Sequence, residues 1–302
     1  MEPQQRIVFY EQIARNKRKS IFLIILVFLA LIVLGAVIGL AMSPDYFLII
    51  MILATIISIA YIWVGYYYSD RIALASVNAK KADPTTHRQL YNSVESMSLA
   101  SGLPMPQIYV MENPQINAFA TGRDPKHAVI CVTTGALNKL EKQELEGVIA
   151  HEMSHIANFD IRFMTLVAVL VGMIAIISQI FLRSLWFKSG DSDNKGNAIF
   201  MIIGIALAIL APIVVQLVQL AISRKREYTA DATAVKFMRT PTGLIKALKK
   251  IGAEHEIPQQ KQNINKAVAP LFISNPFKKE KIASWFSTHP PLSQRINVLE
   301  RM

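Results

Sequence analysis

The sequence predicts a membrane protein with four transmembrane α-helices and a cytosolic α+β domain built from two separated segments. Two observations lead to this fold class. Four hydrophobic blocks each exceed the about 20 residues that a helix needs to cross a bilayer, and two polar segments combine helix and strand patterns. An alternative is that the last two blocks form a hairpin that is only partly inserted. The blocks are Ile21–Ala41, Phe47–Tyr68, Phe163–Phe187 and Ala198–Ile222.

The four blocks divide the chain into five parts. A basic N-terminus (residues 1–20) precedes a first transmembrane hairpin (21–68) and a soluble segment (69–162). A second transmembrane hairpin (163–222) then leads to a second soluble segment (223–302). Because each hairpin returns the chain to the side that it left, both soluble segments and both termini are expected on the same side of the membrane.

Basic residues orient the hairpins. Lysine and arginine gather at the ends that face the soluble segments, whereas the short link Met42–Tyr46 contains none. Because basic residues near membrane helices favour the cytosolic side, the termini and both soluble segments are expected there. The net charge of +11 lies mostly beside the hydrophobic blocks. It therefore suits anionic lipid head groups, and no nucleic-acid recognition module is visible, so nucleic acid is not expected as a partner.

The soluble segments alternate short strands with helices. The first has a helix that opens at Asp83 and stops after Ser101, where Gly-Leu-Pro follows. The single cysteine, Cys131, lies in an apolar strand and is expected to be a buried thiol. The second segment predicts helices from about Ser223, after Pro241 and from Pro291. The expected strands are Gln107–Met111, Ala118–Thr121 and Ala128–Thr134.

The most informative stretch is Val148–Asn158, which reads as a helix and contains His-Glu-x-x-His. His151 and His155 are four residues apart, so their side chains share one helix face, with roughly 6 Å between their bases. Two imidazoles so placed can bind one zinc ion, and Glu152 can reach a water on that ion. The competing interpretation is an amphipathic helix that happens to carry two histidines.

A zinc site of this kind needs a third protein ligand. The second membrane hairpin returns the chain to the side of His151, and Glu227 follows five residues after that return. Asp231 lies one helical turn further, where it could accept a hydrogen bond from a ligand histidine. We therefore predict that Glu227 binds the metal and that Asp231 supports it. The alternative is an acidic surface pair on a basic helix.

Taken together, these motifs resemble the HtpX family of membrane zinc metalloproteases, which are relatives of the prenyl-protein endopeptidases. The resemblance implies a gluzincin fold, one Zn²⁺ per chain, and a multi-pass protein of the prokaryotic cytoplasmic membrane. It also implies cleavage of misfolded or misassembled membrane proteins at the cytosolic face. The resemblance rests on the paired membrane helices and on the segments Asn117–Gly122, His151–His155, Ser223–Asp231 and Ser287–Leu292.

The resemblance also implies roles for residues outside the ligand set. In the family, the strand that begins at Asn117-Ala118-Phe119 borders the cleft and pairs with substrate; a core strand with an ordinary turn is the alternative. An edge strand binds an extended peptide through main-chain hydrogen bonds and so tolerates varied sequences. His289 is expected to stabilise the oxyanion, unless it is a solvated loop histidine. Arg295 is expected to organise Asp231.

Three rival functions remain open at this stage. A processing protease for prenylated or membrane-anchored peptides would use the same motifs. An intramembrane protease is disfavoured because Glu141, Glu144 and Glu146 make the His-Glu-x-x-His helix enter from water. A non-catalytic scaffold with structural zinc would need a fourth protein ligand, and no candidate is evident. The sequence also leaves open whether Ala267–Phe286 gates the cleft.

Overall fold

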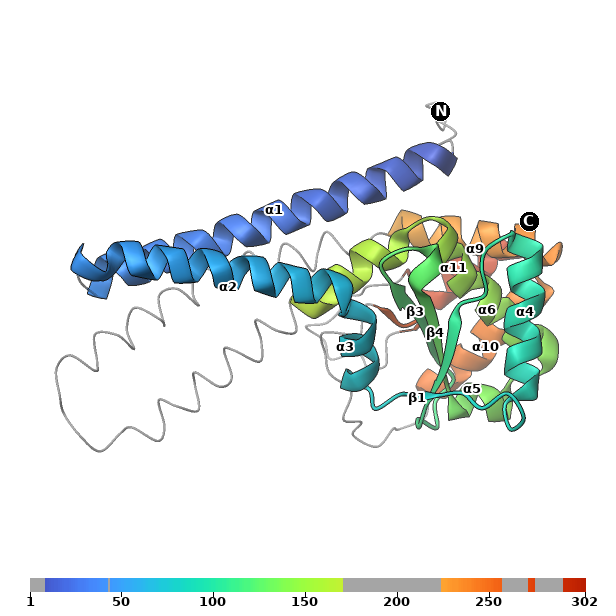
Figure 1. Cartoon of the computed structure of the whole chain (residues 1–302). Coiled ribbons are helices and arrows are strands. Elements are labelled where there is room, and N and C mark those ends of the chain that lie inside the picture. The colour runs from blue at the N-terminus through green and yellow to red at the C-terminus, as the bar shows by residue number, and fades with distance from the viewer. Residues whose placement is uncertain (1–8, 43, 171–223, 257–270, 275–289) are drawn as a thin grey trace, which may run out of the picture.

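The computed structural model describes residues 9–42, 44–170, 224–256, 271–274 and 290–302. Within these parts the chain forms an elongated pair of helices and an α+β domain, and the helix pair projects from one side of that domain (Figure 1). Most of the third predicted hydrophobic block and all of the fourth lie outside the described residues, as does His289.

The projecting pair consists of α1 (Phe9–Met42) and α2 (Phe47–Tyr67). Both are long and apolar enough to cross a membrane, over Ile13–Ala36 in α1 and along all of α2. Large hydrophobic side chains point outward along both helices; Leu48, for example, is 70% exposed. A continuous apolar surface of this kind is stable against lipid and not against water. The first two predicted hydrophobic blocks are therefore confirmed as helices, and α1 extends through the basic stretch before them.

Small residues hold this pair together. A Cβ atom added to Gly35 would lie 2.4 Å from the Cβ of Ala54, and one added to Gly39 would lie 2.9 Å from the ring of Phe47. Both positions require glycine, because any Cβ atom there would overlap the facing helix. Close backbone packing of this kind is how helices associate in lipid, where the hydrophobic effect does not drive them together.

The described part of the α+β domain contains a four-stranded sheet in the order β1-β2-β4-β3. The central pair β2 and β4 is parallel, and both outer pairs are antiparallel. Strand β3 therefore lies at one edge of the sheet. The strands are β1 (Lys80–Lys81), β2 (Gln107–Met111), β3 (Ala118–Gly122) and β4 (Ala128–Thr133).

Both faces of the sheet are covered. In β4, Ile130 and Val132 point to one hydrophobic cluster, while Val129 and Cys131 point to another on the opposite face. This explains why β4 is apolar at nearly every position, and it confirms the buried thiol. Helix α6 (Lys142–Ala157) packs on the first face, and α3 (Ser69–Ser76) covers the second. Around α6 lie α4 (Arg88–Ser101), α9 (Arg224–Met238), α10 (Thr242–Glu256) and α11 (Leu292–Leu299).

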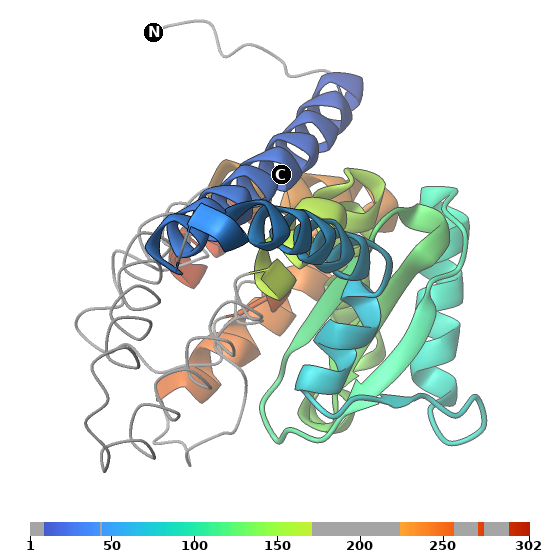
Figure 2. The ribbon, with the colours of Figure 1, turned by 60° about the vertical axis from the view of Figure 1, so that its left-hand side comes forward.

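The end of α6 joins the domain to the helix pair. After a turn, a helix over Asp160–Leu170 leaves α6 at 87°. In Figures 1 and 2 this yellow-green helix lies beside α1 and α2. Leu166 and Leu170 pack with Leu23 and Val27 of α1, and Tyr61 of α2 donates a hydrogen bond to the carbonyl of Leu170. Among the described residues, two helices qualify as membrane spans, or three if the bent pair counts as one.

The three predicted strands and the main helices are confirmed within a few residues. Two short helices and one strand were not anticipated: α3, α5 (Thr134–Lys139) and β1. Each is too short to show a clear hydrophobic period. The helix after Asp83 begins later than predicted, at Arg88, because Asp83 uses its side chain to close a turn with Thr85 and Thr86.

Candidate metal centre

Helix α6 presents its two histidines from inside the domain. Its first turn is closed by a capping box, in which the carboxylate of Glu144 accepts a hydrogen bond from the Glu141 amide at 2.8 Å. Further along, Gly147 lets α10 approach at backbone distance, since a Cβ there would lie 2.5 Å from the amide nitrogen of Leu244. The helix is therefore held at its start and along its length.

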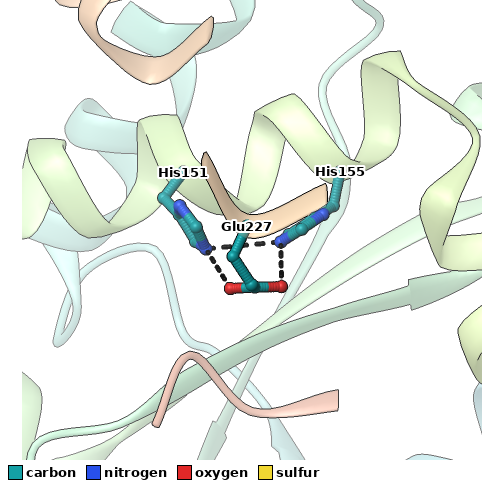
Figure 3. Close-up of side chains that lie close together, drawn as sticks. All are labelled: His151, His155 and Glu227. Atoms are coloured by element: carbon teal, nitrogen blue, oxygen red, sulfur yellow. Dashed lines mark hydrogen bonds and ion pairs between the residues drawn. The ribbon is translucent and has the colours of Figure 1, made fainter. Parts of the chain in front are cut away.

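His151 and His155 of α6 meet Glu227 of α9 in a buried cluster (Figure 3). The two histidine Nε2 atoms lie 3.3 Å apart. The carboxylate of Glu227 faces both rings, with one oxygen 3.6 Å from Nε2 of His151 and the other 3.7 Å from Nε2 of His155. None of the three side chains is more than 7% exposed.

The spacing of this cluster fits a zinc ion. A tetrahedral ion with ligand distances of about 2.0–2.1 Å keeps its ligand atoms roughly 3.3–3.4 Å apart. The two Nε2 atoms lie at this separation, 3.3 Å apart, and each faces a different oxygen of Glu227, at 3.6 and 3.7 Å. One ligand atom from each of the three residues lies within 4.8 Å of the other two. Two imidazole nitrogens and one carboxylate oxygen are also a ligand set that zinc accepts.

A buried ion pair between Asp231 and Arg295 contacts His151. Nδ1 of His151 lies 2.9 Å from Oδ1 of Asp231, which leaves Nε2 of His151 directed at the cluster. Arg295 holds the same carboxylate with two hydrogen bonds, from Nε at 2.9 Å and from Nη2 at 2.6 Å. Arg295 is fully buried on α11. The structure thus brings Asp231 and Arg295, the pair that the family resemblance implies, together beside the cluster.

These neighbours set the charge states of the metal-free site. Burial and Arg295 act to lower the pKa of His151, but Asp231 and Glu227 outweigh them and raise it to about 9. Burial would raise the pKa of Asp231; Arg295 and His151 overcome this and hold it below its ordinary value. Asp231 is therefore a stable anion, able to fix the tautomer of a metal-bound His151.

A second carboxylate, which the sequence interpretation missed, supports His155. Asp160 is fully buried, and its Oδ2 atom lies 3.0 Å from Nδ1 of His155. Its Oδ1 atom accepts a hydrogen bond from Asn16 of α1 at 2.6 Å and lies 3.3 Å from Nε of Arg226. The position of Asp160, just after a helix that carries a metal-binding pattern, was an available signal. Nothing in the sequence pointed to Asn16.

Glu152 lies next to the cluster on α6 and is 1% exposed. Burial raises the pKa of its carboxyl group, and Glu227 adds to this, while the two histidines and the amide of Ala120 act in the opposite direction. The net shift is upward. Its Oε1 atom is buried without a hydrogen-bond partner among the described residues. A buried polar atom in that state is typical of a site that receives a water or substrate group.

The edge of β3 that does not pair with β4 is occupied by residues 271–274 of the same chain. The amide of Ile273 donates to the carbonyl of Ala118 at 2.9 Å, and Phe119 and Phe272 form an antiparallel bridge. The side chain of Asn117 donates to the carbonyl of Ser274 at 2.9 Å. Arg295 donates to the carbonyl of Ile273 at 3.2 Å. All residues of this segment, 271–274, are buried.

The three residues predicted to bind substrate therefore differ in what they can contribute. Ala118 contributes its backbone carbonyl, and Asn117 contributes its amide side chain. The ring of Phe119 packs edge-on against Phe272, 5.0 Å between centroids, on the face of the sheet away from α6. His289, the predicted oxyanion residue, lies outside the described residues.

An apolar helix pair beside a buried cluster of two histidines and a glutamate is the arrangement expected of a membrane-attached protein with a metal-binding site. Comparisons with known proteins specify it further. Residues 84–302 match the model of Peptidase family M48. A "Protease HtpX homolog" of Caldanaerobacter subterraneus subsp. tengcongensis is 45% identical over 307 residues, covering 97% of both chains. Another of Listeria monocytogenes serotype 4a is 41% identical over 310 residues, covering 98% of this chain and 100% of the relative.

The chain therefore belongs to the HtpX proteases of peptidase family M48, and it is a membrane metalloprotease. Among solved structures, the crystal structure of S. mikatae Ste24p aligns with a TM-score of 0.48 and 20% identity. That alignment covers 96% of this chain and 66% of the Ste24p chain.

Proposed function

We propose that this protein is a zinc endopeptidase that cleaves misfolded or damaged membrane proteins at the cytosolic face of the prokaryotic cytoplasmic membrane. One zinc ion per chain would be held by His151, His155 and Glu227. The observation that carries the proposal is the convergence of these three buried side chains next to a buried carboxyl group, Glu152. Such a protease would serve membrane protein quality control and the response to stress.

The chemistry divides between the metal and the protein. Zinc held here would polarise the scissile carbonyl and lower the pKa of a bound water toward about 7. Glu152 would accept the proton of the attacking water and deliver it to the leaving amine. The raised pKa of Glu152 supports this role, because a carboxyl group that is harder to ionise is a stronger base once ionised. Arg295 would donate a hydrogen bond to a substrate carbonyl, as it does to that of Ile273.

The edge of β3 is the proposed binding place for substrate. An extended peptide there would pair with the carbonyl of Ala118 and with the side chain of Asn117. Segment 271–274 makes these same bonds from within the chain, which supports the idea that the edge accepts an extended backbone. A substrate would have to displace this segment before it could pair with β3, since Ala118 offers one carbonyl to that side.

The position of the site favours substrates that emerge from the bilayer. The helix that follows Asp160 packs directly on the apolar pair. At the domain end of α2, three tyrosines stack with arginines, as aromatic and basic side chains do at a membrane surface. These pairs are Tyr66 with Arg162, Tyr67 with Arg123 and Tyr68 with Arg71. The metal cluster would then lie close to the level of the lipid head groups.

The proposal is tested with the full-length chain in detergent, by measuring bound zinc and the hydrolysis of an unfolded membrane protein. Glu152→Gln should keep zinc and lose cleavage by about 10²-fold or more, because the base is gone while the ligands remain. His155→Ala and Glu227→Ala should lose both zinc and cleavage. A prenylated peptide tested in parallel distinguishes a processing role.

Two results would contradict the proposal. Cleavage by zinc-loaded Glu152→Gln at the rate of the unaltered protein would remove Glu152 from the mechanism. Full zinc binding by Glu227→Ala would show that the metal is held elsewhere. Lys236→Ala, on an exposed part of α9, is a matched control that should change neither measurement.

A further inference from the structure

Asn16 is a buried polar residue in a helix whose other role is to cross the membrane. It is 4% exposed, whereas its neighbours Arg15 and Lys17 are exposed. Burying an amide side chain costs free energy unless its hydrogen bonds are made. Asn16 makes two, both to the turn that follows α6: one to the carbonyl of Asn158 at 2.9 Å and one to Oδ1 of Asp160 at 2.6 Å.

The same turn is strained, and α1 covers it. Phe159 lies between the two partners of Asn16 and has φ = 57°, a left-handed conformation that a bulky residue rarely adopts. The ammonium group of Lys17 lies 4.4 Å from the centre of the Phe159 ring. Asn16 and Lys17 of α1 therefore both contact this strained turn, although more than a hundred residues separate them from it in the sequence.

The turn matters because Asp160 orients a predicted metal ligand. Its Oδ2 atom faces Nδ1 of His155 at 3.0 Å, while Oδ1 faces Asn16. The amide of Asn16 thus occupies one carboxylate oxygen and leaves the other to face the histidine. Arg226, one residue before Glu227, approaches the same Oδ1 atom at 3.3 Å. Asp160 consequently joins α1, α6 and α9 at a single carboxylate.

We propose that Asn16 is a positioning residue of the metal centre: through Asp160, the first transmembrane helix sets the orientation of His155. The membrane helix is then part of the scaffold of the active site and not only its anchor. The inference rests on the proposed role of His155 as a zinc ligand. Partners that orient a metal-binding histidine typically contribute 10–100-fold to metal affinity, because they fix the ring and its tautomer.

The test measures zinc dissociation constants of the full-length protein in detergent by competition with a chelator. Asp160→Asn should weaken zinc binding by about 10–100-fold. Asn16→Leu, which keeps the size of the side chain but removes both donors, should weaken it by about tenfold. Asn16→Asp should be at least as weak, because a second carboxylate would face Asp160. Ser20→Ala is the matched control: Ser20 is also buried on α1, and its hydroxyl donates a hydrogen bond to the carbonyl of Asn16 within its own helix.

A double-mutant cycle separates positioning from a general effect on stability. If Asn16 acts through Asp160, the variant carrying both Asn16→Leu and Asp160→Asn should bind zinc no more weakly than Asp160→Asn alone. The visible spectrum of the cobalt-substituted protein should also change in Asn16→Leu and stay unchanged in Ser20→Ala, since it reports ligand geometry. Asn16→Ala provides the same comparison if the leucine variant does not fold.

The possible failures are distinct. Unchanged zinc affinity in both Asn16→Leu and Asn16→Ala would overturn the inference, as would strictly additive losses in the double variant. If His155→Ala itself kept full zinc affinity, the proposed function would fail at the ligand set, and this inference would fail with it.

Discussion

The state of His151 before the metal binds links zinc affinity to pH. Its pKa of about 9 in the metal-free site lies above the ordinary 6.5, because Asp231 and Glu227 outweigh burial and Arg295. His151 therefore carries a proton at neutral pH, and a metal ion must displace it. We predict that zinc affinity rises by up to about tenfold per pH unit as pH rises toward 9.

The metal-free protein should show the opposite trend. A group whose pKa is raised by folding stabilises the folded state fully below its unfolded pKa, near 6.5, and loses that contribution as pH rises through about 9. Unfolding of the metal-free chain should thus become easier across this range, while the zinc-bound chain becomes more stable. Chelator competition and thermal unfolding at several pH values would check both trends. Zinc affinity that is flat from pH 6 to 8 would contradict the prediction.

At the scale of single residues, the sequence predicted the three metal-binding side chains and Asp231, but neither Asp160 nor Asn16. His151 and His155 share a face because of their spacing alone, and Asp231 shares a face with Glu227 for the same reason. Asp160 was within reach of the same argument, since it follows His155 by five residues, but the bend after α6 hid its direction. Asn16 required the packing of α1 against that bend.

Packing between α6 and α10 is the element-scale feature that positions the histidine helix. Gly147→Ala would place a methyl group 2.5 Å from a backbone nitrogen of α10, so the two helices must separate. We predict destabilisation by about 1–3 kcal/mol from overpacking, partly offset by the about 1 kcal/mol that alanine gains in a helix. Zinc affinity should fall as well, because α6 carries two of the ligands.

Gly252→Ala is the matched control for this change. Gly252 lies in α10, and an added Cβ would approach its nearest neighbour, Leu292, at an ordinary 3.7 Å. This variant should be neutral or slightly more stable. Chemical unfolding of both variants would decide the matter, and equal stabilities would contradict the proposed role of Gly147.

The pairing of segment 271–274 with β3 leads to a prediction about substrate access. Phe119 and Phe272 face each other as a bridge pair, so cysteines at both positions should form a disulfide. With Cys131 changed to serine to leave one pair of thiols, the oxidised protein should cleave an unfolded membrane protein at least tenfold more slowly than the reduced protein.

The reduced form of the same variant is the internal control, because loss of the two rings affects both forms equally. Addition of a reductant should restore its cleavage rate. If the oxidised and reduced forms cleaved at the same rate, substrate would bind without displacing segment 271–274. That result would move the substrate site away from this edge of β3.

At the scale of the whole molecule, the basic residues at the domain end of the helix pair predict that the α+β domain lies in the cytosol. Leu99 lies on α4 and is 80% exposed, so a cysteine there should react freely with a thiol reagent. In a Cys131→Ser background, Leu99→Cys should be labelled by a membrane-impermeant reagent in inside-out vesicles and protected in intact cells. Labelling in intact cells would place the domain outside the cytosol.

The sequence by itself determined the features that depend on neighbouring residues. The lengths of the first two hydrophobic blocks, the strand at Gln107–Met111 and the shared face of His151 and His155 all follow from period and spacing within one element. These features can be predicted locally, because the repeat of a helix or strand fixes the direction of each side chain within that element.

Only the tertiary structure decided which distant surfaces meet. Asn16 bonds to Asp160 across 144 residues, and Asn117 bonds to Ser274 across 157. Contacts of this range depend on how whole helices and strands pack, because each partner is ordinary within its own segment. The metal cluster illustrates both levels: the pattern on α6 is local, whereas the groups that orient it arrive from the membrane helix and from the end of the chain.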